Sequence, residues 1–159
     1  MRLQDLTKFL PYGSSKLLID SFLYIDKKIS VSYYKVQEGD VEGHFGLFRG
    51  VDMIELSAQT MLGGALVKTI EKENLTLEDK GKIDILFAKV GETLFKKKVE
   101  LGEYLVCVTK FRKIGPTCSG ESKLFSLGRN TDNLNNFASV TDQFKNSKFD
   151  ELVESKKIG

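Results

Sequence analysis

One histidine and one glutamate stand out as residues that could carry acid–base chemistry. His44 is the only histidine of the chain, and it lies in a loop that also contains Gly43, Gly46 and Gly50. Glycine opens backbone conformations that other residues rarely adopt, so such a loop can approach a ligand closely. An apolar helix is predicted to begin directly after the loop, and it carries Glu55. A base, an acid and the free N–H groups of a helix N-terminus together make a general acid–base site.

The predicted helix places Glu55 where a core residue is expected. At about 100° per residue, it falls in the middle of an apolar stripe made by Val51, Ala58, Leu62, Ala65 and Leu66. Burial there disfavours the charged form of a carboxyl group. Two interpretations stay open: Glu55 is a catalytic acid, or it is a structural carboxylate that pairs with a cation or a backbone donor. The same choice applies to His44, since a lone histidine is more often an ordinary exposed or packed residue.

The surrounding segments predict an α+β domain that positions this stretch. The long helix is expected over about 51–72, and its Gly63-Gly64 pair suggests that another backbone comes very close there. Alternating and apolar runs predict strands at 16–25, 29–33, 82–90, 94–99, 104–114, 119–127 and 137–144, with an Asn-rich loop at 130–136. We expect one antiparallel sheet against the helix in a single domain over 1–145, followed by a charged tail over 146–159.

Bulk composition gives no indication of a nucleic-acid or membrane partner. The 24 basic and 22 acidic residues leave a formal net charge of +2. No run approaches the ~20 apolar residues of a membrane-spanning helix, and we expect no signal peptide. Cys107 and Cys118 lack the spacing of a metal site or a disulfide framework, which is typical of reduced thiols in a cytoplasmic protein.

The order of the motifs resembles the signature of the hot-dog-fold β-hydroxyacyl-acyl-carrier-protein dehydratases. Gly-His-Phe at 43–45, Gly-Val at 50–51 and Glu-Leu-Ser-Ala-Gln at 55–59 are similar to that family's Gly-His-Phe loop, Pro-Gly-Val and Glu-Ala-Leu-Ala-Gln helix. Leu-Pro at 10–11 and Leu-Leu-Ile-Asp at 17–20 resemble its amino-terminal Leu-Pro-His and Leu-Leu-Val-Asp stretch. Phe-Lys-Lys-Lys-Val at 95–99 resembles its Phe-Arg-Arg-Pro-Val segment. The resemblance implies a hot-dog fold, in which an antiparallel sheet wraps around one long central helix.

The resemblance also implies a role for each candidate residue. His44 would remove the proton α to the thioester, and Glu55 would help the β-hydroxyl group leave as water. The Gly50 N–H would polarise the thioester carbonyl. The remaining substrate-binding candidates, which also fit a plain core, are Val51, Ile54 and Gln59. In this family the histidine and the acid of one site come from different subunits, so the implied active unit is a homodimer, or a trimer of such dimers.

The implied partner is an acyl carrier protein, which holds the substrate on its phosphopantetheine, and no metal or redox cofactor is implied. Carrier proteins are acidic, so basic side chains could steer their docking. The candidates for this role are Arg49, Lys96, Lys97, Lys98 and Arg112. The lysines fit equally well as edge-strand lysines that oppose aggregation.

The loop between His44 and Gly50 departs from the family pattern. It is shorter, it contains no proline, and Arg49 stands at the place of the expected proline. Our first hypothesis is a dehydratase that converts (3R)-hydroxyacyl thioesters to trans-2-enoyl thioesters. The second is a non-catalytic acyl-binding or partner subunit, and the third is a thioesterase in which Glu55 activates water.

Overall fold

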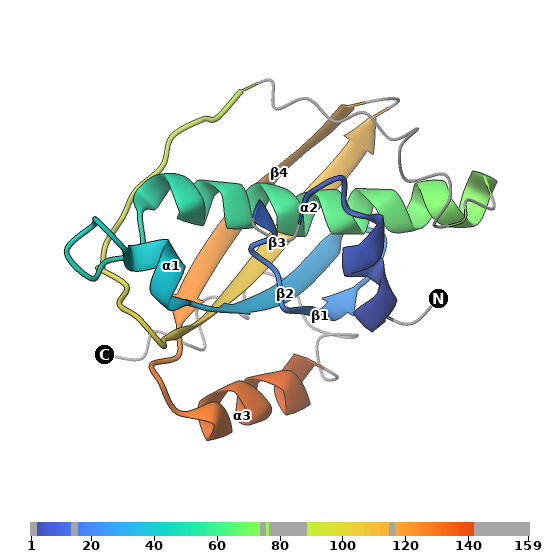
Figure 1. The fold of residues 1–159 in the computed structure, drawn as a ribbon. Helices are drawn as coiled ribbons and strands as arrows, with labels where there is room; N and C mark the ends of the chain where they lie inside the picture. The colour runs from blue at the N-terminus through green and yellow to red at the C-terminus, as the bar shows by residue number, and fades with distance from the viewer. Residues whose placement is uncertain (1–2, 14–15, 74–75, 77–88, 115–116, 142–159) are drawn as a thin grey trace.

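The structure is a computed structural model that describes residues 3–13, 16–73, 76, 89–114 and 117–141. Its elements are the 3₁₀ helix η1 (Leu3–Phe9), β1 (Ser21–Ile25), β2 (Ile29–Lys35), α1 (Glu38–Val41), α2 (Gly50–Glu73), β3 (Tyr104–Ile114), β4 (Thr117–Ser126) and α3 (Thr131–Thr141). The four strands form one antiparallel sheet in the order of the chain. Helix α2 lies across one face of this sheet and α3 lies against the other (Figure 1). The expected α+β arrangement around one long helix is confirmed.

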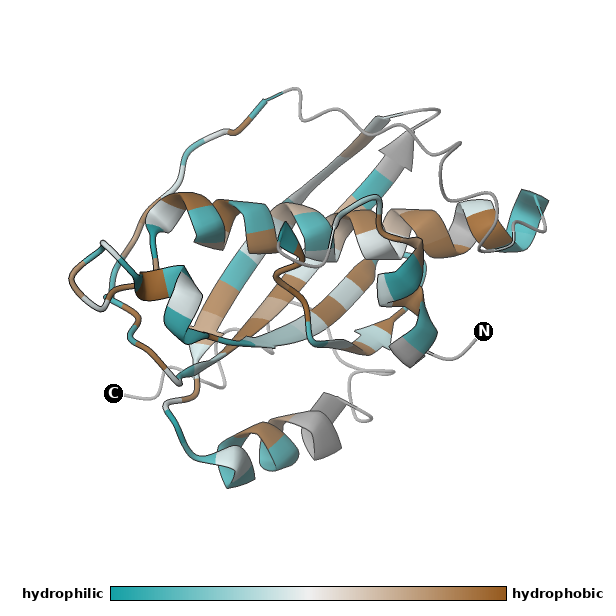
Figure 2. Ribbon diagram, in the orientation of Figure 1, coloured by the Kyte–Doolittle hydropathy of each residue, from teal (hydrophilic) through white to brown (hydrophobic). Residues whose placement is uncertain are grey.

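The central strands alternate between these two faces, as a period of two requires. On β3, Leu105 and Cys107 belong to the core beneath α2. The intervening Val106 and Val108 belong to the core on the α3 side, and Val108 pairs there with Val31 of β2. Figure 2 shows the resulting apolar bands on the strands. Neither Cys107 nor Cys118 on β4 is part of a disulfide.

Hydroxyl groups attach α2 to the sheet at one defined rotation. Ser30 donates to the Thr60 carbonyl over 2.7 Å, and the hydroxyls of Ser32 and Thr60 share a 2.6 Å hydrogen bond. All three residues are fully buried. Buried polar groups are costly unless they are paired, so these bonds favour one orientation of the helix over its rotated alternatives. In that orientation Leu56 points into the core and Gln59 turns toward the segment that follows η1.

The Gly63-Gly64 pair meets aromatic rings, and the expectation of a second backbone there is wrong. A Cβ atom added at Gly63 would lie closer than 3.0 Å to the ring of Phe22 on β1. One added at Gly64 would lie equally close to the ring of Phe111 on β3. Both rings are buried, so the missing side chains allow the sheet to approach the helix directly.

Helix α3 replaces the expected Asn-rich loop at 130–136 and the described part, 137–141, of the strand expected at 137–144. The Asn130 side chain accepts a 2.9 Å hydrogen bond from the backbone N–H of Asp132, which is an N-cap at the start of a helix. Leu134 and Phe137, three positions apart, then fall on one helical face and are buried against the sheet. The polar residues between them face outward, which is why the stretch resembles a loop in sequence.

The strand expected at 94–99 is absent from the described structure, where residues 89–99 carry neither helix nor strand. This segment passes the N-terminal end of α2 in an extended path (Figure 1). Most of the strand expected at 82–90 and all of the tail expected at 146–159 lie outside the described residues. None of the described helices is long and apolar enough to cross a membrane.

Candidate active site

His44 lies in a tight loop between α1 and α2. Its backbone N–H donates to the Val41 carbonyl over 3.1 Å, and its own carbonyl accepts from Leu47 over 3.0 Å. The next residue, Phe45, has a φ of 56°, a left-handed conformation that side chains other than glycine adopt at a cost of about 1 kcal/mol or more. The side chains of His44 and Phe45 are both exposed, and Phe45 is fully so. The loop therefore presents these two rings to the outside of a single chain.

A buried tyrosine supports both ends of the His44 loop. Tyr34 on β2 donates a 2.7 Å hydrogen bond to the Asp40 carboxylate, which also accepts from the Gln37 N–H over 2.7 Å. On the far side of the loop, the ring of Phe48 lies 6.0 Å from the ring of Tyr34. Burial and the Asp40 charge raise the pKa of Tyr34, so its hydroxyl remains a donor at neutral pH. These contacts therefore hold both ends of the exposed loop in place.

Gly50 is the first residue of α2, as the sequence predicts. The first N–H groups of a helix have no partner within the helix and can bind an oxygen. The ring of Phe95 lies directly over this end, because a Cβ atom added at Gly50 would stand 2.9 Å from the ring. Glycine is therefore required for the observed contact, and Phe95 borders the candidate oxyanion site.

Glu55 is half-buried in one chain, so the expectation that the helix buries it fully is not met. Its Oε1 accepts a 3.1 Å hydrogen bond from the amide of Gln59, one turn later. Burial and then the nearby charge of Glu55 raise the pKa of the Tyr12 hydroxyl group. The described residues include no ion pair with Glu55. Sequence reasoning missed Tyr12, because it read the Pro11-Tyr12-Gly13 stretch only as a turn.

Gln59 is fully buried, and the bonds of its amide explain why. Its Oε1 accepts from the Leu18 N–H over 2.8 Å, while its Nε2 donates to the Lys16 carbonyl over 2.8 Å as well as to Glu55. These three bonds use the acceptor and both donors of the amide. In a single chain, Gln59 therefore holds Glu55 and the N-terminal segment, while its predicted contact with substrate stays a prediction.

The structure anchors His44 and Glu55 separately. Among the described residues, no hydrogen bond joins the two side chains, and each rests on different partners: His44 on α1 and its neighbours, Glu55 on Gln59. The base and the acid of one chain are therefore held separately, and no observed interaction among the described residues brings them together.

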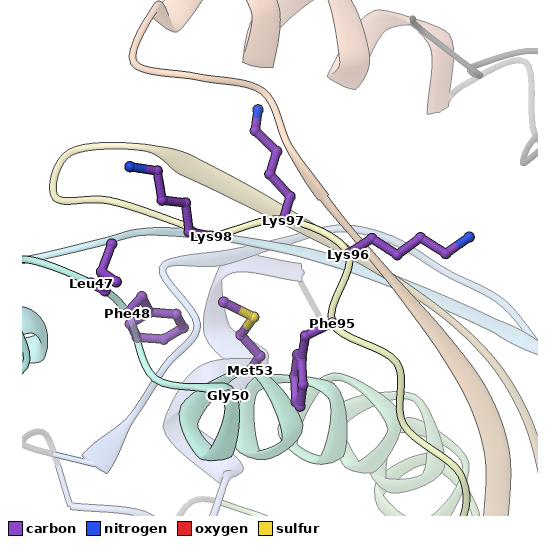
Figure 3. A pocket seen from close by; sticks show the side chains of 8 residues that line it. All are labelled: Leu47, Phe48, Gly50, Met53, Phe95, Lys96, Lys97 and Lys98. Atoms are coloured by element: carbon purple, nitrogen blue, oxygen red, sulfur yellow. The ribbon is translucent and has the colours of Figure 1, made fainter.

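A cavity of about 400 Å³ opens beside the start of α2. Its lining residues are Leu47, Phe48, Gly50, Met53, Phe95, Lys96, Lys97 and Lys98. Figure 3 shows Phe48, Met53 and Phe95 around the hollow, with the three lysine side chains extending outward from its rim. Two of the predicted substrate-binding residues do not line this cavity: Val51 is 62% exposed and Ile54 is half-buried. Phe48 and Met53 are lining residues that the sequence reasoning did not single out.

The basic residues predicted for docking do not form one cluster. Arg49 makes a two-pronged ion pair with Asp52, over 2.6 and 2.7 Å, and Lys98 pairs with Glu100 over 2.8 Å. Arg112 is at the opposite end of the molecule from the lysines. Its neighbour Phe111 contacts Gly64, whereas Phe95 contacts Gly50, about 21 Å away along α2 at 1.5 Å per residue. Lys96 and Lys97 thus remain as the basic rim of the cavity.

An antiparallel sheet folded over one long central helix is the architecture of the hot-dog fold, and this chain is a hot-dog-fold protein. No protein-family model matches it. Curated proteins do match. The chain is 31% identical over 116 residues to a 3-hydroxyacyl-acyl-carrier-protein dehydratase FabZ of Streptococcus agalactiae, covering 70% of this chain and 76% of the relative.

Two further relatives carry the same name. The FabZ of Coxiella burnetii is 32% identical over 120 residues, with 72% of this chain and 80% of the relative covered. The FabZ of Streptococcus sanguinis is 31% identical over 116 residues, with 70% and 76% covered. The chain therefore belongs to the 3-hydroxyacyl-acyl-carrier-protein dehydratase FabZ family, which confirms the resemblance seen in its motifs.

Proposed function

We propose that the protein dehydrates (3R)-hydroxyacyl thioesters on acyl carrier protein to trans-2-enoyl thioesters, in fatty acid or related acyl-chain synthesis. Family membership supports the reaction. The observation in this chain that supports it most directly is the position of Glu55. That carboxyl group stands one turn into a helix whose N-terminus can bind an oxygen, and it accepts a hydrogen bond from Gln59 with no neutralising cation among the described residues. A polar, positioned carboxyl group on an otherwise apolar helix suits an acid that delivers a proton.

The proposed steps balance with side chains alone. His44 takes the proton from the carbon α to the thioester, and the Gly50 N–H stabilises the negative charge that develops on the thioester oxygen. The bond from the β-carbon to its hydroxyl group then breaks, and Glu55 protonates the departing oxygen to give water. The electron pair of the broken C–H bond becomes the new double bond, so the proposal involves no metal or redox cofactor.

We further propose that two chains complete each site, with His44 of one chain facing Glu55 of the other. The separate anchoring of the two residues within one chain supports this arrangement. So do large apolar side chains left exposed around the site: Phe45 at 100%, Leu94 at 73%, Val51 at 62% and Phe95 at 50%. A second copy that covers this surface would remove it from water, which is favourable for apolar area of this extent.

Acyl carrier protein is the proposed partner at the cavity rim. Lys96 and Lys97 extend outward there, where they can attract an acidic protein and the phosphate of its prosthetic arm. Arg49 and Lys98 contribute less net charge, because each is already paired with a carboxylate. The cytoplasmic location expected from the sequence stays a prediction.

The reverse reaction provides the test. Purified protein is mixed with a trans-2-butenoyl thioester, and hydration is followed by the loss of the enoyl absorbance. We expect His44→Ala and Glu55→Gln each to lower kcat at least about 100-fold, the usual contribution of a general acid or base. Glu42→Gln, at an exposed glutamate close to the same loop, is the matched control and leaves the rate unchanged.

Three results would contradict the proposal and point to the rival functions. Wild-type protein that binds acyl carrier protein without turnover would identify a non-catalytic acyl-binding subunit. Release of free thiol from an acyl thioester would identify a thioesterase. Hydration that survives both the His44 and the Glu55 substitution would place the chemistry elsewhere in the chain.

A further inference from the structure

We propose that Tyr34 and Asp40 are positioning residues for His44, and that this pair, the Tyr34–Asp40 clamp, fixes the loop that carries the histidine. The inference rests on the proposed function, because it concerns the base of that reaction. Asp40 lies in α1, four residues before His44, and Tyr34 lies on β2, which leads into α1 (Figure 1). Both residues act through the backbone of the loop, and neither needs to touch the substrate.

The imidazole of His44 has no side-chain support in the described part of the chain. The side chain is exposed, and none of the described residues forms a hydrogen bond or an ion pair with its ring. A general base must nevertheless stand within about 2.6–3.2 Å of the atom whose proton it takes. The placement of the ring therefore depends on the backbone from which it extends.

The sequence of the loop does not fix that backbone by itself. Residues 43–50 include three glycines and no proline, the residue that would restrict φ. Gly43, Phe45 and Gly46 all have positive φ, at 70°, 56° and 75°. A phenylalanine keeps a left-handed conformation only where the surrounding structure enforces it. The contacts at the two ends of the loop must supply this constraint.

The Asp40 carboxylate fixes the beginning of the loop. Its Oδ2 accepts hydrogen bonds from the Tyr34 hydroxyl and from the Gln37 N–H, each over 2.7 Å. Hydrogen bonds to an ionised group are stronger than those between neutral groups. The next residue, Val41, is buried, and its carbonyl accepts the 3.1 Å hydrogen bond from the His44 N–H. A short series of contacts therefore runs from the buried tyrosine to the backbone of the histidine.

The ring of Tyr34 fixes the end of the loop as well. It lies 6.0 Å from the ring of Phe48, which follows His44 by four residues. Phe48 is buried, and its N–H donates to the Val99 carbonyl over 2.9 Å. The hydroxyl group of one side chain thus holds the segment before His44, and its ring holds the segment after it. Tyr34 thereby fixes the two ends of the loop relative to each other.

Tyr34→Phe removes the hydroxyl group and keeps the ring against Phe48. We expect kcat for enoyl hydration to fall about 10- to 100-fold, with KM changed less than about twofold, because the base must be correctly placed in the transition state. Asp40→Ala should cause the same loss. Asp40→Asn keeps an oxygen that can accept both hydrogen bonds, so its kcat should stay within about threefold of the wild type. A loss in Asp40→Asn as large as that in Asp40→Ala overturns the inference, because the charge and not the hydrogen bonds would then be responsible.

Tyr24→Phe is the matched control, because the chain repeats the same arrangement away from the site. The Tyr24 hydroxyl donates to Asp26 over 3.0 Å, and the Asp26 carboxylate also accepts from the N–H groups of Lys28 and Ile29. This turn is at the opposite end of β2, roughly 20 Å from the His44 loop at about 3.4 Å per residue. Tyr24→Phe should keep the wild-type kcat and KM. An equal loss of kcat in both tyrosine variants overturns the inference.

Hydrogen exchange at the His44 backbone amide tests the clamp without activity. His44 is the only histidine, so isotope labelling of histidine alone gives a single backbone amide signal in an NMR spectrum. This N–H is protected by its hydrogen bond to the Val41 carbonyl. We expect it to exchange at least about tenfold faster in Tyr34→Phe, because the loop opens more often once a hydrogen bond to a charged group is lost. Its exchange in Tyr24→Phe should match that in the wild type.

The two measurements separate the inference from the proposed function. If the wild type shows no turnover, the proposed function fails, and the exchange rate still tests the clamp. A Tyr34→Phe enzyme with wild-type kcat overturns the inference and leaves the proposed function standing. An unchanged exchange rate in Tyr34→Phe also overturns the inference, even where kcat falls, because the hydroxyl group would then not act through the loop.

Discussion

Substitution of Gly50 by alanine should separate stability from activity. The new Cβ atom would lie 2.9 Å from the tip of the Phe95 ring and 3.3 Å from a second ring edge. Ordinary contact between carbon atoms needs about 3.5 Å or more, so the ring must move by about half an ångström. Phe95 is half exposed and lies in a segment with no described helix or strand, so it can make this movement.

The expected cost in stability is small, and the expected cost in activity is large. Alanine is the better helix former by about 1 kcal/mol, which offsets the displacement of an exposed ring, so the free energy of unfolding should change by less than about 1 kcal/mol. The methyl group and the displaced ring, however, occupy the space beside the N–H that would bind the thioester oxygen. We expect a misplacement on this scale to lower kcat about 10- to 100-fold, which is the usual effect of a poorly positioned catalytic group.

Urea unfolding and the hydration assay measure these two quantities on the same preparation. Gly39→Ala in α1 is the matched control, because nothing lies within 4 Å of its added Cβ. The double variant with Phe95→Ala tests the cause: if the ring carries the effect, it should behave as Phe95→Ala alone. Wild-type activity in Gly50→Ala would refute the oxyanion role of this helix end. A loss of stability above about 3 kcal/mol, the scale of a badly overpacked core, would refute the argument that the ring is free to move.

Two further substitutions test other parts of the structure. Gly63→Ala, on the same helix, should destabilise the protein by about 1–3 kcal/mol in urea unfolding, because its Cβ would overlap the buried Phe22 ring. A neutral or stabilising effect would contradict the close packing of α2 on β1. Lys97→Glu at the cavity rim should raise the KM for carrier-bound substrate several-fold and leave the KM for a small thioester unchanged. Arg112→Glu, about 20 Å away along the helix direction, should change neither KM. Equal effects of the two charge reversals would argue against docking at the cavity.

Periodic patterns in the sequence predicted the parts of the fold that bury a regular face. The alternation at 29–33 gave β2, and the apolar run after Gly50 gave α2, because burial repeats at the period of the element. Helix α3 was not predicted from the sequence, for the opposite reason. Its asparagines are typical of loops, and over 131–137, the part of α3 whose side chains are described, two positions, Leu134 and Phe137, reach the core.

The residues of the candidate site also fall into those that the sequence predicted and those that it did not. Local motifs located His44, Gly50 and Glu55 on the correct loop and helix, because these lie within one continuous stretch. The partners that arrive from elsewhere could not be found by spacing. Tyr12 comes near enough to Glu55 to feel its charge, and Phe95 contacts Gly50, only after the chain has folded back on itself. For the same reason, like charges in the sequence did not predict a shared patch, and Arg112 lies apart from the lysines.

Helix α3 limits how copies of this chain can assemble. Leu134 and Phe137 close the face of the sheet that α2 leaves open, so the described fold has three layers. Two such sheets cannot stack through that face without first displacing α3. Any trimer of dimers would have to be built from loops, sheet edges and helix surfaces. With α3 on one face of the sheet, the α2 side, which carries the candidate active site, is the side on which the proposed second copy would have to lie.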